Sequence, residues 1–179
     1  MISELEILNA SILIVDDQQS NVLLLEQVLL EVGYQCIAST MNPYAVCELH
    51  RKNHYGLILL DLQMPGMDGF QVMEGLKEIE TAGYLPVLAI TAQPGHKLRA
   101  LAAGAKDFIA KPFDLVEVKM RIHNMLEVRL LYNKLESLNK VLENYNQMLG
   151  QTVLKQTTEL GESQARLRRL TELAGTTPF

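Results

Sequence analysis

Residues 56–70 read GLILLDLQMPGMDGF, and this stretch decides the fold. It opens with an apolar run, Leu57 to Leu60, which stops at Asp61 and a loop rich in Pro and Gly. A short apolar run before such a loop is typical of a strand that is buried on both faces of a parallel sheet. Asp61 would then lie at the carboxyl end of the strand, where open α/β sheets bind ligands. Asp68 is placed to cap a helix that begins near Phe70.

The same alternation of short apolar runs and helically spaced apolar residues extends outward from this stretch in both directions. The predicted strands are Ser11–Val15, Gln35–Ser39, Leu57–Leu60, Val87–Thr91 and Phe108–Ala110. The predicted helices are Gln19–Val32, 42–51, Phe70–Glu80, Gly95–Ala103 and one that begins near Asp114. Repeated strand–helix alternation favours a doubly wound α/β fold, in which helices cover both faces of a parallel sheet.

Polar residues that could take part in chemistry follow the predicted strands. Asp16 and Asp17 end the first strand, Asp61 the third, Thr91 the fourth and Lys111 the fifth. Because the carboxyl ends of parallel strands share one edge, these side chains should converge. Three carboxylates repel one another unless a cation lies among them, and hard oxygen ligands suit Mg²⁺ or Mn²⁺. A lysine and a hydroxyl beside them are the groups that a phosphoryl group needs.

Four segments around these positions resemble the receiver domain of bacterial two-component response regulators. They are LIVDD (13–17), LLDLQMPGMDG (59–69), AITA (89–92) and GAKDFIAKPF (104–113). The resemblance implies a flavodoxin-like (βα)5 sheet with strand order 2-1-3-4-5. It also implies a phosphoacceptor switch, with a sensor histidine kinase or phosphotransfer protein as its phosphoryl donor. The tail contains no helix-turn-helix, no GG(D/E)EF-type loop and no kinase motif, so no output enzyme is expected in this chain.

The resemblance assigns the acidic residues their roles. Asp61 would be the nucleophile that becomes an aspartyl phosphate. Asp17 and Asp61 would bind Mg²⁺ directly, Asp16 would act largely through water, and the backbone carbonyl of Gln63 would be a further ligand.

The remaining roles concern the phosphoryl group and the switch. Lys111 and Thr91 would bind the phosphoryl oxygens, and Thr91 with Phe108 would form the conformational switch. The amides of Gln63 and Gln93 would orient or block an attacking water, and so tune the lifetime of the phosphoryl group.

The predicted last helix continues far beyond the resemblance. Asp114 to Leu149 contains neither Pro nor Gly. Apolar side chains recur there at alternating steps of four and three: Leu131, Leu135, Leu138, Leu142, Tyr145 and Leu149. This heptad pattern predicts a parallel coiled coil and therefore a homodimer. Val153 then makes a second step of four, a stutter that locally unwinds the supercoil.

These patterns divide the chain into a receiver domain (1–125), a coiled-coil signalling helix (126–173) and a disordered or truncated end (174–179). The stretch 158–174 resembles helices that lead into PAS and output domains. A phosphorylation-independent dimerisation scaffold is the alternative function. An aspartate-nucleophile hydrolase would carry its DxD after the first strand, and a flavodoxin needs a Ser/Thr/Gly-rich phosphate loop there. Neither pattern is present in LIVDD.

Composition agrees with a folded domain. The 179 residues are 48% hydrophobic and 21% charged, with a formal net charge of −5, which argues against nucleic acid as a partner. No apolar run is long enough to span a membrane, and the N-terminus lacks the basic cluster of a signal peptide, so a cytoplasmic location is expected. Cys36 and Cys47 form no metal-binding pattern and are predicted to be small core residues.

Overall fold

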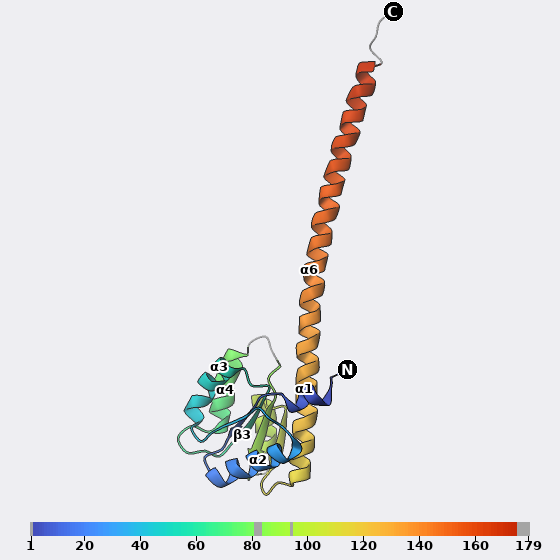
Figure 1. Cartoon of the computed structure of the whole chain (residues 1–179). Helices are drawn as coiled ribbons and strands as arrows, with labels where there is room; N and C mark the ends of the chain where they lie inside the picture. Colours follow the sequence, from blue (N-terminus) through green and yellow to red (C-terminus); the bar gives the residue numbers. More distant parts are fainter. Residues whose placement is uncertain (1, 81–83, 94, 175–179) are drawn as a thin grey trace, which may run out of the picture. The chain divides into compact units, whose positions relative to one another are not determined.

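The structure is a computed structural model that describes residues 2–80, 84–93 and 95–174 (Figure 1). The chain forms two compact units, residues 1–133 and 134–179. The predicted functional boundary at 125/126 stays a prediction, and residues 175–179 at the predicted disordered end lie outside the described residues.

The first unit is a doubly wound α/β domain around a five-stranded parallel sheet. Its strands are β1 (Ile12–Val15), β2 (Ile37–Thr40), β3 (Leu57–Asp61), β4 (Val87–Thr91) and β5 (Asp107–Ala110). They lie in the order β2-β1-β3-β4-β5, which confirms the predicted fold class and strand order. The three central strands are fully buried, whereas the edge strands β2 and β5 are partly exposed. This difference explains why the central runs are uniformly apolar in the sequence.

Helices cover both faces of the sheet. The helices are α1 (Glu4–Leu8), α2 (Gln19–Val32), η1 (Pro43–Ala45), α3 (Val46–Asn53), α4 (Gly69–Ile79), α5 (His96–Ala103) and α6 (Leu115–Ala174). One core packs α3, α4 and α5 on Leu13, Val15, Ile58, Leu60 and Val87. The other packs α1, α2 and the start of α6 on Ile12, Ile14, Leu57, Leu59 and Ile90. Alternate residues of each strand therefore serve opposite cores.

Several elements differ from the sequence prediction. Residues 42–51 do not form one helix: a 3₁₀ turn capped by Asn42 precedes α3. The second strand begins at Ile37 rather than Gln35, and Cys36 before it is exposed, so the prediction of a core position was wrong for Cys36. Cys47 is partly buried and packs against the first core. The edge position of β2 explains both differences, because an edge strand needs no continuous apolar run.

Helix α1 was not predicted. Its start is a capping box in which Ser3 accepts from the backbone N–H of Glu6 and the Glu6 carboxylate accepts from the backbone N–H of Ser3. Ile7 of this helix is buried in the second core. The spacing Ser-x-x-Glu is a sequence signature of a helix start, and the segment SELEIL carried it.

The second unit is helical from residue 134 to 174. Its large apolar side chains, through residue 172, are exposed to solvent. In the ranges that the structure covers, no helix combines the length and apolar character needed to cross a membrane.

Candidate functional site

The register of the sheet brings the acidic residues together. Val15 of β1 is the partner of Leu60 in β3, so Asp16 and Asp61, which follow these two residues, lie side by side at the carboxyl edge. Thr91 at the end of β4 pairs with Ala110, which Lys111 follows. Four residues that are distant in sequence therefore reach one edge of the sheet because the strands are parallel and in this order.

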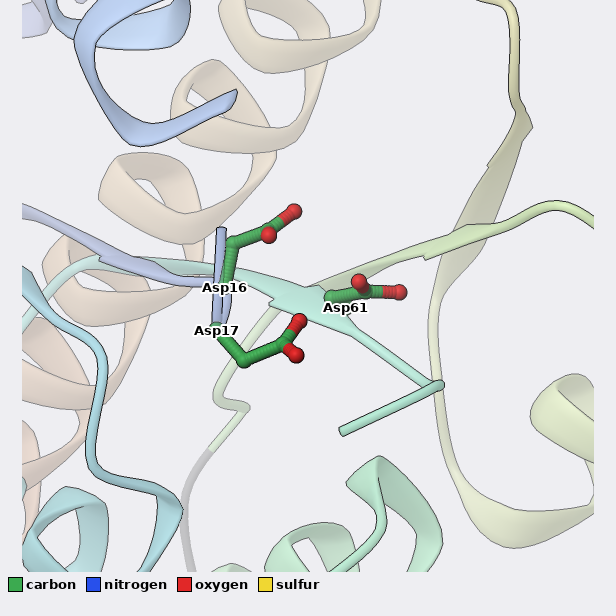
Figure 2. A group of neighbouring side chains, drawn as sticks. All are labelled: Asp16, Asp17 and Asp61. Carbon is green, nitrogen blue, oxygen red and sulfur yellow. The ribbon is translucent and has the colours of Figure 1, made fainter. Parts of the chain in front are cut away.

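Three carboxylates form the centre of the site (Figure 2). One oxygen each from Asp16, Asp17 and Asp61 lies within 4.8 Å of the others. Asp16 is 1% exposed and Asp61 2%, whereas Asp17 is partly buried. Like charges this close inside a protein repel strongly, so the arrangement requires a cation.

Lys111 supplies part of the positive charge. Its Nζ donates to Oδ2 of Asp61 at 2.7 Å and to Oδ2 of Asp16 at 2.9 Å. Burial raises the pKa of Asp61, although the hydrogen bonds from Lys111 and from the Gln63 backbone lower it, and the Asp16 charge raises it further. Burial acts to lower the pKa of Lys111, but its bonds to Asp61 and Asp16 outweigh this effect and raise it. The charges on these groups therefore depend on one another.

The two neighbouring aspartates differ in their surroundings. Asp16 accepts from the backbone N–H of Gln18 at 2.9 Å and from the amide of Asn21, in addition to Lys111. Oδ1 of Asp17 is buried, and no hydrogen-bond donor for it is found among the described residues. A buried carboxylate oxygen without a donor is a suitable ligand for a hard cation.

The donor set therefore fits a divalent ion such as Mg²⁺. It consists of carboxylate oxygens only, and Asp17 contributes a residue whose buried Oδ1 has no hydrogen-bond partner in the described part of the chain. The Gln63 backbone N–H donates to Oδ1 of Asp61 at 3.1 Å, which holds the start of the loop after β3 against this carboxylate.

Thr91, Gln63, Gln93 and Phe108 were also predicted as site residues. The buried Thr91 hydroxyl accepts from the backbone N–H of Gln93 at 3.1 Å and donates to its carbonyl at 3.4 Å. The side chains of Gln63 and Gln93 are exposed. Phe108 on β5 is partly buried against the first core, and Nζ of Lys97 lies 4.9 Å from its ring centroid.

Gly69 allows the loop after β3 to close on the site. A Cβ at this position would lie 2.6 Å from the carbonyl oxygen of Asp61 and 2.8 Å from Cα of Leu62. The Gly69 N–H donates to the Leu62 carbonyl at 3.2 Å, and the Asp68 side chain caps the same end of α4. The start of α4 is thus packed directly against the backbone of Asp61, and the predicted cap at Asp68 is present.

Sequence reasoning missed Asn21. Its amide Nδ2 lies 3.1 Å from Oδ1 and 3.0 Å from Oδ2 of Asp16. The available signal was its place in the first turn of a helix that directly follows the two aspartates. Such a position faces the carboxyl edge of the sheet.

This fold and this group of side chains define a phosphoacceptor domain of the receiver class. The family model described as the response regulator receiver domain matches residues 12–123, and the chain belongs to this family. The comparisons confirm the resemblance found in the sequence, and they give no support to the phosphorylation-independent scaffold. Receiver domains of this family interact with histidine kinases or phosphotransfer proteins.

Curated relatives show how far the similarity extends. The chain is 37% identical over 130 residues to "Response regulator PleD" of Caulobacter vibrioides, and the aligned region covers 72% of this chain and 28% of that protein. It is 30% identical over 115 residues to "Chemotaxis protein CheY" of Bacillus subtilis, which covers 64% of this chain and 96% of that protein. The chain thus matches just over a quarter of PleD but nearly all of CheY.

Solved structures agree. A putative response regulator from Chloroflexus aurantiacus is 30% identical with a TM-score of 0.62, and the match covers 66% of this chain and 98% of that chain. The receiver domain of sensor histidine kinase PA1611 from Pseudomonas aeruginosa is 26% identical with a TM-score of 0.61, at coverages of 66% and 98%. That structure has a magnesium ion coordinated in its active-site cleft.

Proposed function

We propose that this protein accepts a phosphoryl group on Asp61 from a phosphohistidine of a sensor histidine kinase or phosphotransfer protein, in the cytoplasm. The observation that carries this proposal is the position of Lys111, whose Nζ lies within 2.9 Å of both Asp16 and Asp61 beside a third carboxylate. A phosphoryl acceptor needs this combination of a nucleophilic carboxylate, a cation and a ligand set for Mg²⁺.

The chain's own residues would carry out the transfer as follows. A carboxylate oxygen of Asp61 attacks phosphorus, the P–N bond of the donor breaks, and its imidazole leaves. The Gln63 N–H holds Oδ1 of Asp61 and so orients the carboxylate. Lys111 moves its donation from Asp61 to an oxygen of the phosphoryl group. Asp17, Asp61 and the Gln63 carbonyl would hold Mg²⁺ (or Mn²⁺), which would supply positive charge to balance the charge that develops during the transfer.

The switch would follow from the same change. The Thr91 hydroxyl would leave the Gln93 backbone and donate to the phosphoryl group, and Phe108 would move into the space beside it. The exposed amides of Gln63 and Gln93 would control the access of water to the aspartyl phosphate. We propose that this slow hydrolysis and the self-phosphorylation are the only reactions that the receiver domain catalyses.

The test uses the full chain with acetyl phosphate and Mg²⁺, followed by intact mass spectrometry. We expect one added phosphoryl group in the wild type and none in Asp61→Asn. Asp68→Asn is the matched control, since asparagine is also a good helix cap and the loop acid is not part of the site. Equal labelling of Asp61→Asn and wild type would refute the assignment of the acceptor.

We further propose that the second unit forms a parallel coiled coil with a second copy. Leu135, Leu138 and Leu142 are each more than half exposed and recur at heptad spacing. Apolar side chains in such a row along a charged helix are covered when two helices pair. The paired helices of this coiled coil would transmit the phosphorylation state away from the receiver domain.

Sedimentation equilibrium tests the pairing. We expect twice the 20.1 kDa chain mass for the wild type and the single-chain mass for Leu138→Glu. Asn144→Glu, which places the same charge outside the heptad row, should remain a dimer. A wild-type monomer at micromolar concentration, or a Leu138→Glu dimer, would contradict the proposal.

A further inference from the structure

Asp16 is saturated with hydrogen-bond donors in this structure. An ionised carboxylate offers about four acceptor positions. At Oδ1 of Asp16 two of them are used by the Gln18 N–H at 2.9 Å and Asn21 Nδ2 at 3.1 Å. At Oδ2 the other two are used by Asn21 Nδ2 at 3.0 Å and Lys111 Nζ at 2.9 Å. Only the Lys111 bond comes from a group that the proposed transfer requires to move.

The amide of Asn21 occupies a particular place on this carboxylate. Its nearly equal distances to Oδ1 and Oδ2 put Nδ2 in the position from which a cation would chelate both oxygens. Asn21 is neutral, so it fills this position without cancelling the negative charge of Asp16. In a carboxylate held in this way, only the acceptor position that Lys111 occupies can exchange its donor during the proposed transfer.

We infer that Asn21 is a positioning residue of the metal site. By holding both oxygens of Asp16, Asn21 fixes the orientation of this carboxylate so that it binds water on the ion, and leaves direct ligation to Asp17 and Asp61. The contrast with Asp17 supports this division, because Oδ1 of Asp17 is buried and has no donor in the described residues. The inference rests on the proposed Mg²⁺ site and adds a residue to it.

The size of the effect follows from known metal sites. Residues that orient metal ligands from the outer shell change metal affinity by about 10-fold to 100-fold when they are replaced. Asn21→Leu keeps the approximate volume and removes the donor, so we expect about a tenfold weaker affinity for Mg²⁺. Asn21→Gln keeps an amide and should restore a large part of it.

A double-mutant cycle tests whether Asn21 acts through Asp16. Mg²⁺ is titrated into the ¹⁵N-labelled full chain, without any phosphodonor, and the dissociation constant is taken from amide shifts. The four proteins are wild type, Asn21→Leu, Asp16→Asn and the double variant. Gln27→Leu, an exposed amide on the same helix, is the matched control, and thermal melting in EDTA confirms folding.

The outcomes separate the inference from the proposed function. The positioning role of Asn21 is supported if Asn21→Leu weakens Mg²⁺ binding about tenfold in the wild-type background and less than about twofold in the Asp16→Asn background. Unchanged binding in Asn21→Leu, or the same loss in both backgrounds, overturns the positioning role while the metal site stands. Absence of Mg²⁺ binding to the wild type overturns the proposed metal site, and the inference with it.

Discussion

The close approach of Gly69 to Asp61 gives a quantitative test of how the loop after β3 supports the site. In Gly69→Ala the new Cβ would lie 2.6 Å from the Asp61 carbonyl oxygen, 2.8 Å from Leu62 Cα and 2.9 Å from Leu62 Cδ2. Two of these three atoms belong to the backbone, so a rotamer change cannot relieve the contact. The start of α4 or the end of β3 has to move.

The magnitude follows from two opposing terms. Extra atoms forced into a packed site cost about 1–3 kcal/mol, and two backbone contacts place this case near the upper end. The higher helix propensity of alanine offsets at most about 1 kcal/mol of this cost. We therefore expect a net loss of about 1–2 kcal/mol in the free energy of unfolding, measured by urea denaturation at an unchanged m value.

The same displacement reaches the chemistry, because the carbonyl that must move belongs to Asp61 itself. A shift of about 1 Å in a reacting group can reduce a rate by about 100-fold. Phosphorylation of Gly69→Ala by acetyl phosphate should therefore be slower by at least about tenfold, measured under conditions in which the protein is fully folded. Gly95→Ala is the matched control, since a Cβ there meets nothing within 4 Å. Wild-type stability together with a wild-type rate in Gly69→Ala would refute this reasoning.

Three further predictions concern charge, metal and helix capping. Burial raises the pKa of Asp61 above its ordinary value of 3.8, so its contribution to stability is complete below about pH 3.8 and is lost as pH rises through the folded-state pKa. Asp61→Asn should therefore melt at a higher temperature than wild type at pH 7 in EDTA, with the difference vanishing toward pH 3; a lower melting temperature at pH 7 would contradict this sign. Mg²⁺ at 100 times its dissociation constant should stabilise the wild type by about 2.7 kcal/mol, and the same Mg²⁺ concentration should leave the melting temperature of Asp17→Asn nearly unchanged. Asp68→Ala should lose about 1 kcal/mol in urea denaturation, whereas Asp68→Asn, which keeps a capping side chain, should match the wild type.

The carboxyl edge of the sheet could be predicted because its signals are local and its geometry is generic. Each central strand is a continuous apolar run that stops at a polar residue, as in Leu57 to Asp61. Parallel strand ends meet at one edge whatever the details of the helices, so Asp16, Asp61 and Lys111 could be brought together without coordinates. The strand order of the sheet was predicted from the resemblance to receiver domains, since the local sequence pattern does not specify which strand is central.

Other features could not be predicted because they depend on distances rather than on residue type. The hydrogen bond of Asn21 to Asp16 depends on the orientation of α2 relative to the end of β1, and no sequence pattern gives this orientation. The break between η1 and α3 was hidden by Asn42 and Pro43, which start either kind of helix. Helix α1, in contrast, was predictable from the capping box at Ser3 and Glu6.

The position of Lys111 links stability to signalling. In this structure its ammonium group partly compensates the charges of Asp16 and Asp61, whose carboxylates are almost fully buried. Unpaired buried charges are costly, so these two bonds stabilise the carboxyl edge. The proposed transfer takes Lys111 away from Asp61 and gives it a phosphoryl oxygen instead, which leaves Asp16 to be held by Gln18 and Asn21. The residues that hold Asp16 in place therefore determine how much of the carboxyl edge stays ordered while Lys111 changes partner. Loss of Asn21 should destabilise the phosphorylated protein more than the resting one.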